Sequence, residues 1–145
     1  MDFICIGGII LMNLIKNLIE KVIVNMKYER NTKNILKYAE LQNQDSPKIV
    51  VTEILPNSIV HNVNVIKKYD IISEINDKKI ISIEDVRKNL LKPLKNKKDM
   101  FIKFKTEDNT ESVFELKKIL ENETNMADTF QYTKDEVFKK LEKLL

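Results

Sequence analysis

Glycine is almost absent from this chain. Among 145 residues the two glycines, Gly7 and Gly8, are adjacent, and no residue from 9 to 145 is a glycine. Turns that need a positive φ must therefore use other residues, and asparagine and aspartate tolerate that region best. We expect such turns at three places: Asn57, Asn76-Asp77 and Asp108-Asn109.

The composition is that of an ordinary globular chain. It has 43% apolar and 32% charged residues, and 25 Lys and Arg against 22 Asp and Glu leave a net charge of +3. This length suits one domain with short appendages. The charge is too weak to indicate binding to nucleic acid or to an anionic membrane. One cysteine, Cys5, and one histidine, His61, exclude an intramolecular disulfide and multi-histidine metal sites, so we expect no cofactor and no metal.

The N-terminus is an apolar run from Phe3 to Met12. Asp2 stands where a secretory signal would carry basic residues, so we expect no signal peptide. Ten apolar residues are too few to span a membrane. We predict a buried strand that leads into a helix capped by Asn13, within a soluble chain whose compartment stays open.

The middle of the chain alternates strand and helix signals. Residues 48–55 and 71–75 predict strands, the second turning into residues 78–81. Ser82 caps a helix with acidic residues in its first turn, and Pro93 stops it. Residues 100–105 and 112–116 alternate as a strand pair. Short helices are expected over 32–41 and 58–65.

The C-terminal part divides into two predicted segments. Residues 119–132 are polar and indicate a linker. Thr133 to Glu136 has capping-box spacing and opens an amphipathic helix over 133–145. Its apolar side would carry Val137, Phe138, Leu141 and Leu145.

Residues 56–86 resemble a PDZ domain of the circularly permuted bacterial kind. Three segments follow the family's pattern P-G-S, K-P-G-D-V-I-L-S-I-N-G-K and S-L-E-D-L. They are Pro56-Asn57-Ser58, Lys67-Lys68-Tyr69-Asp70-Ile71-Ile72-Ser73-Glu74-Ile75-Asn76-Asp77-Lys78 and Ser82-Ile83-Glu84-Asp85-Val86. Asn57, Asp77 and Tyr69 stand at family glycine positions. The resemblance implies an α+β fold: a PDZ-like, partly open β-barrel with two helices, plus an N-terminal strand and helix and a C-terminal helix.

Residues upstream are similar to the end of the protease domain in HtrA/Deg serine proteases. Gly8 to Glu20 resembles that family's strand G-F-A-I-P followed by its linker helix. With the PDZ part, the resemblance covers roughly residues 7–118. It implies four units: residues 1–21 as protease-type strand and helix, 22–118 as the PDZ-like domain, 119–132 as linker and 133–145 as C-terminal helix.

The catalytic residues of such a protease are missing here. The chain has no G-N-S-G-G-type loop, and His61 lies inside the PDZ-like part. We therefore expect a non-catalytic module that binds a peptide or a protein C-terminus. Two alternatives stay open: the C-terminal fragment of a complete serine endopeptidase, which could form a homo-oligomer through its missing protease domain, and an assembly module with a self-occluded groove.

The resemblance implies a groove between an unpaired strand edge and the helix from Ser82, since PDZ domains add a peptide as an extra strand. On the strand side it implies a carboxylate-binding loop followed by an edge strand, with these residues: Val22, Ile23, Val24, Asn25, Met26, Lys27 and Tyr28. Over the loop, a continuation of the preceding helix is also possible. On the helix side it implies Ile83, Arg87 and Leu90. Ile83 and Leu90 could equally be core residues, and Arg87 could be a solvated surface residue.

Three further predictions concern single features. Asp70 would have a structural role in local backbone bonding. His61 would be an exposed helix residue. The groove could be filled by residues 3–12 or by the C-terminal helix, and occupation by the chain's own backbone would contradict recognition through an open groove.

Overall fold

The structure is a computed structural model that describes residues 2–14 and 47–145. Several predictions fall on residues outside these ranges and stay predictions. They are the helix after Asn13, the helix over 32–41, and the strand side of the groove with its carboxylate loop. The residues of that strand side are Val22, Ile23, Val24, Asn25, Met26, Lys27 and Tyr28.

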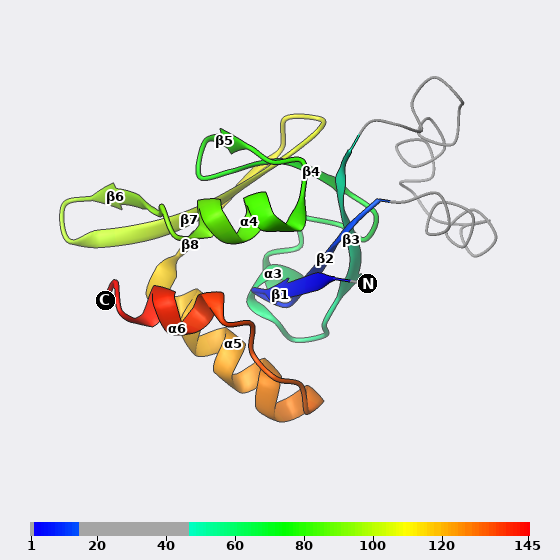
Figure 1. Cartoon of the computed structure of the whole chain (residues 1–145). Coiled ribbons are helices and arrows are strands. Elements are labelled where there is room, and N and C mark those ends of the chain that lie inside the picture. Colours follow the sequence, from blue (N-terminus) through cyan, green and yellow to red (C-terminus); the bar gives the residue numbers. More distant parts are fainter. Residues whose placement is uncertain (1, 15–46) are drawn as a thin grey trace, which may run out of the picture.

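An antiparallel sheet of eight strands forms the body of the described residues. Its order is β1-β2-β3-β4-β7-β6, with β5 paired to β4 and β8 paired to β7 (Figure 1). The strands are β1 (Phe3–Ile6), β2 (Ile9–Asn13), β3 (Ile49–Ile54), β4 (Ile71–Ile75), β5 (Lys78–Lys79), β6 (Leu94–Asn96), β7 (Asp99–Thr106) and β8 (Glu111–Glu115). The strands predicted in the middle of the sequence are therefore present.

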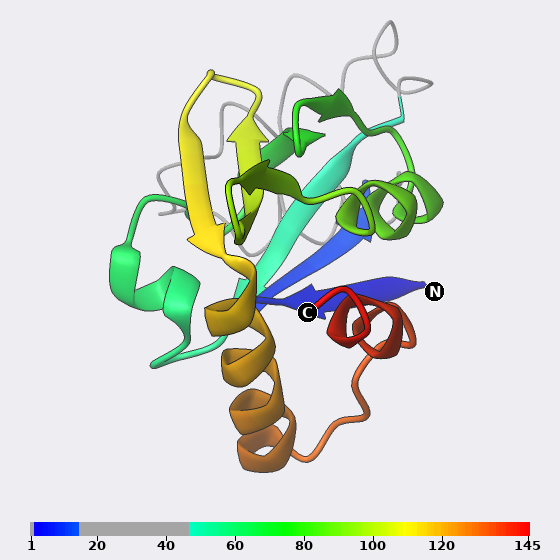
Figure 2. The ribbon, with the colours of Figure 1, turned by 90° about the vertical axis from the view of Figure 1, so that its left-hand side faces the viewer.

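The apolar N-terminal segment is a hairpin, not the single strand predicted. Gly7 and Gly8 have φ angles of 63° and 95°, which place both glycines of the turn in the left-handed region. β2 then pairs with β3, from Ile9 opposite Ile54 to Asn13 opposite Ile49. Figure 2 shows the hairpin continuing the sheet next to β3. Residues 3–13 thus belong to the same sheet as the strands assigned to 22–118, not to a separate unit over 1–21.

Two predicted short helices begin at serine caps, of which the cap at Ser82 was itself predicted. In α3 (Ile59–Val63) the Ser58 hydroxyl accepts the backbone N–H of His61 at 3.2 Å. In α4 (Ile83–Leu90) the Ser82 hydroxyl accepts the backbone N–H of Asp85 at 3.1 Å. α4 ends three residues before Pro93, as predicted.

The predicted linker over 119–132 is wrong, because these residues lie mostly in helix α5 (Leu116–Phe130). Its buried face runs Leu116, Ile119, Leu120, Glu123 and Met126. Glu123 interrupts the apolar pattern, so the helix resembles a polar segment in sequence. The last helix, α6 (Val137–Glu142), is present but shorter than predicted, and Leu145 is exposed rather than part of its apolar side.

The replacement of glycine by other residues in turns is confirmed. Asn57, Asp77 and Asn109 have φ angles of 64°, 68° and 66°. Tyr69, at a family glycine position, also has a positive φ of 72°. Asp70 has its predicted structural role, since its carboxylate accepts the backbone N–H of Lys67 at 2.8 Å.

The predicted fold class is confirmed as an α+β fold with an open antiparallel sheet and helices. One core cluster joins side chains from the hairpin, the central strands and helices α4, α5 and α6. The C-terminal helices therefore pack on the domain itself. α4 contacts both β2 and α6, so the position of these three elements defines the candidate site.

Candidate functional site

Within the described residues, α4 contacts two strands of the sheet, β2 and β4. β2 is the second strand in the sheet order, between β1 and β3. One edge of β2 pairs with β3, and β1 pairs with its other edge. The register runs from Phe3 opposite Met12 to Ile6 opposite Ile9. The chain's own β1 thus covers the edge of β2 that β3 leaves free. The strand side predicted for the open groove lies outside the described residues, so that groove stays a prediction.

β1 has the orientation that a bound peptide would have. It runs antiparallel to β2, and its last residue, Ile6, lies opposite the first residue of β2, Ile9. In a PDZ-type groove the terminal carboxylate is held at the start of the edge strand. Here the Gly7-Gly8 turn takes that place and continues directly into β2.

The turn is packed closely against the rest of the domain. The carbonyl of Gly7 accepts the backbone N–H of Val60 at 3.1 Å, and that of Gly8 accepts the N–H of Leu55 at 2.7 Å. A Cβ on Gly8 would lie 2.0 Å from the Cβ of Ser58. Only glycine fits at this approach of the hairpin to α3.

Arg87 on α4 binds β1 and the segment before α6 together. Its Nη1 and Nη2 donate to the two carboxylate oxygens of Asp2 at 2.7 and 2.9 Å. Nη2 also donates to the carbonyl of Phe3 at 3.2 Å, and to Oδ2 of Asp135 at 2.8 Å. Nε donates to the same Asp135 oxygen at 3.0 Å. The Arg87 guanidinium thus binds two carboxylates and, in β1, the backbone carbonyl of Phe3.

The charges in this network stabilise one another. Hydrogen bonds to Asp2 and then to Asp135 raise the pKa of the Arg87 guanidinium. The same bond from Arg87 lowers the pKa of the Asp2 carboxyl. The Asp2 side chain is 55% exposed and that of Asp135 only 16%, so the Asp2 side of the network is the one that water and salt can reach.

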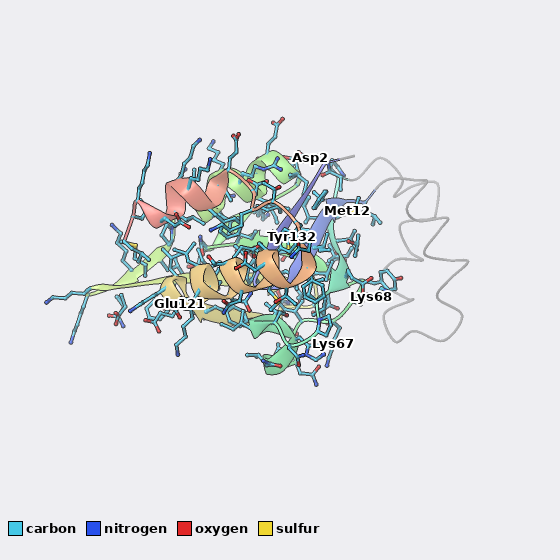
Figure 3. The ribbon with its side chains drawn as sticks, turned by 90° about the horizontal axis from the view of Figure 1, so that it is seen from below. Asp2, Met12, Lys67, Lys68, Glu121 and Tyr132 are labelled. Atoms are coloured by element: carbon cyan, nitrogen blue, oxygen red, sulfur yellow. The ribbon has the colours of Figure 1, made fainter. Side chains whose placement is uncertain are left out.

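A second contact holds β1 from the side of α5. The Cys5 thiol donates to the Tyr132 hydroxyl at 3.3 Å, and that hydroxyl donates to Oε1 of Glu123. Glu123 is fully buried, and its Oε2 has no hydrogen-bond partner among the described residues. Burial raises the pKa of the Glu123 carboxyl to about 7 and that of the Cys5 thiol to about 12. In Figure 3 Asp2 lies at one end of β1 near α4, and Tyr132 lies beside α5.

The residues predicted for the helix side of the groove fall into two groups. Ile83 and Leu90 are 2% and 0% exposed and belong to the core, which is the alternative that the sequence left open. Their contact with a peptide stays a prediction. The Arg87 side chain is 30% exposed, and two carboxylates of its own chain bind it. His61 is an exposed residue of α3, as predicted.

Sequence reasoning allowed residues 3–12 to occupy the groove, but it missed that they form a hairpin. It also missed Asp2 and Asp135 as partners of Arg87. One signal could have found the hairpin. The only two glycines stand together inside an apolar run, and a Gly-Gly pair between two apolar segments is typical of a two-residue hairpin turn. No local signal pairs Asp2 or Asp135 with Arg87, because these residues are distant in sequence.

In the described residues, helix α4 packs against an antiparallel sheet in which β1 pairs along β2. The family model described as a PDZ domain matches residues 1–136, so the chain belongs to the PDZ domain family. PDZ domains in general bind peptides or protein termini. A search of curated proteins found no match. Nothing in these comparisons indicates an HtrA/Deg protease.

Among helices within residues 2–14 and 47–145, none has the length and apolar character needed to cross a membrane.

Proposed function

We propose that this chain is a non-catalytic PDZ module that recognises a peptide strand at the β2 edge, and that β1 occupies this edge until a ligand displaces it. The observation that carries the proposal is the pairing of β1 with β2 in the orientation of a bound peptide. β1 is then an intramolecular ligand joined to its site by the Gly7-Gly8 turn.

The energetics favour a closed resting state. A tethered strand has an effective concentration on the order of millimolar or higher, so a free peptide competes at a disadvantage. The Arg87–Asp2 pair and the Cys5–Tyr132 contact add to the strand pairing. Both contacts can be weakened without changing the hydrophobic core. The Asp2 side chain is largely exposed, and Cys5 contacts Tyr132 through one hydrogen bond.

Cys5 provides the readout, since it is the only thiol of the chain and lies on β1, 6% exposed. A thiol reagent should modify it slowly in the folded chain, because reaction requires an exposed thiolate. We expect free-carboxylate peptides with apolar ends to accelerate this modification as their concentration rises. Full-length chain, a peptide library and mass spectrometry are sufficient for the measurement.

Two variants of the full chain sharpen the test. Ile4→Asp places a charge at a position that is 1% exposed, which should expel β1 and strengthen peptide binding. The matched control is Val113→Asp on β8, where the side chain is 54% exposed. Asp2→Asn is the milder variant, in case Ile4→Asp does not fold. The proposal would be contradicted if no peptide changed the rate of Cys5 modification and no peptide bound to the Asp2→Asn chain.

The same outcome would favour the alternative of an assembly module whose groove is permanently filled. That alternative rests on the same β1–β2 pairing and differs only in whether the strand can leave.

An HtrA/Deg-like parent protein, with or without protease activity and with oligomerisation through its protease domain, is also a proposal. It rests on the resemblance of residues 7–20, of which Ile9–Asn13 is a strand of the PDZ sheet. An in-frame G-N-S-G-G-type loop upstream of Met1 would support it.

A further inference from the structure

We propose that the groove selects peptides with an acidic side chain four residues before their C-terminal residue, because β1 shows which side chains the site accepts. This inference rests on the proposed function. If a free peptide replaces β1 in the same register, its last residue takes the place of Ile6, and the residue four positions earlier takes the place of Asp2.

The side chains of β1 differ in how far they are exposed, and this difference predicts which residues a peptide can carry at each position. Ile4 and Ile6 are 1% and 0% exposed and belong to the core cluster, so the corresponding peptide residues should be aliphatic. Cys5 is buried against the Tyr132 hydroxyl, which suits a small side chain such as serine. Phe3 is 51% exposed, so this position should tolerate most residues.

The acidic preference comes from Arg87. Its guanidinium donates two hydrogen bonds to the Asp2 carboxylate, at 2.7 and 2.9 Å, in a geometry that suits a planar carboxylate. Asp135, in the segment before α6, binds the same guanidinium and holds it in place when β1 leaves. A peptide with a neutral or basic residue there would leave the Asp2 side of Arg87 without a partner.

The experiment compares three peptides that differ only in their first residue: Asp-Phe-Ile-Ser-Ile, Asn-Phe-Ile-Ser-Ile and Lys-Phe-Ile-Ser-Ile. Each is titrated into the full-length Asp2→Asn chain, with Cys5 modification and direct binding as readouts. The Asp peptide should bind roughly three- to tenfold more tightly than the Asn peptide, and the Lys peptide should bind most weakly. The preference should shrink as salt is added.

The full-length Arg87→Gln chain is the control for the origin of the preference. It should bind the Asp and Asn peptides equally. Binding of all three peptides to Asp2→Asn with equal affinity would overturn the acidic preference and leave the proposed function intact. Absence of binding by every peptide to both Asp2→Asn and Ile4→Asp would overturn the two together.

Discussion

Nη2 of Arg87 donates to Oδ2 of Asp135 at 2.8 Å, although 48 residues separate them in sequence. This contact ties α4 to the segment that enters α6, and through Asp2 it extends to β1. The Arg87 side chain therefore links its own helix to two other parts of the chain, the N-terminal segment with Asp2 and Phe3 and the segment before α6.

Replacing Arg87 by alanine should destabilise the domain. The half-buried carboxylate of Asp135 would lose its charged partner, which costs about 1 to 3 kcal/mol in the free energy of unfolding. Urea unfolding followed by circular dichroism measures it. Lys118→Ala is the control, because Lys118 pairs with Glu115 on an exposed surface. Equal unfolding midpoints for both variants would contradict the role of Arg87.

Stability should fall as the pH rises through about 7. Burial raises the pKa of Glu123 to about 7 from an ordinary value of 4.5, so the folded chain keeps a proton that the unfolded chain releases. The contribution is complete below pH 4.5 and is lost as pH rises through about 7. It amounts to roughly 3 kcal/mol at most. The groups that face Glu123 are Tyr132, Cys5, Lys134 and Asp135.

Unfolding midpoints measured from about pH 5 to about pH 9 test this dependence. In Glu123→Gln, which keeps an acceptor for the Tyr132 hydroxyl, the decline near pH 7 should disappear. A decline of the same size in the variant would show that another group causes it.

Gly8→Ala should be more damaging than Gly7→Ala. Both residues have positive φ, which costs an alanine about 1 to 2 kcal/mol. At Gly8 the added Cβ would also lie 2.0 Å from Ser58, whereas at Gly7 it would lie 3.0 Å from the Cγ2 atom of Val60. Thermal melts of the two variants compare them directly. Equal decreases in melting temperature would mean that Ser58 moves aside without cost when a Cβ is added at Gly8.

Lys97→Gly should stabilise the turn between β6 and β7. Lys97 has a φ of 59°, a strained value for lysine that glycine adopts freely. The gain should be several tenths of a kcal/mol, since the flexibility of glycine in the unfolded chain offsets part of it. Lys98→Gly is the matched control: this neighbour has no positive φ, so the same change should destabilise. A loss in both variants would contradict the strain at Lys97.

Much of the fold could be predicted because its signals are local. The caps at Ser58 and Ser82, the turns at Asn57 and Asp77, and the strand between Pro47 and Pro56 depend on a few neighbouring residues each. Helix α5 was missed because a buried carboxyl, Glu123, stands in its apolar face. The hairpin was missed because residues 3–12 were interpreted as one continuous apolar strand, although the Gly7-Gly8 pair inside them is a turn signal.

Local patterns in the sequence were sufficient to predict the fold class, the family resemblance and the positions where other residues replace glycine in turns. The pairing of β1 along β2 follows only from how the elements pack in three dimensions. Strand pairing along β2 and the ion pairs of Arg87 join Asp2, Phe3 and Asp135 to a helix far from them in sequence. Such contacts follow from how the elements pack, and no periodicity or spacing within a segment encodes them.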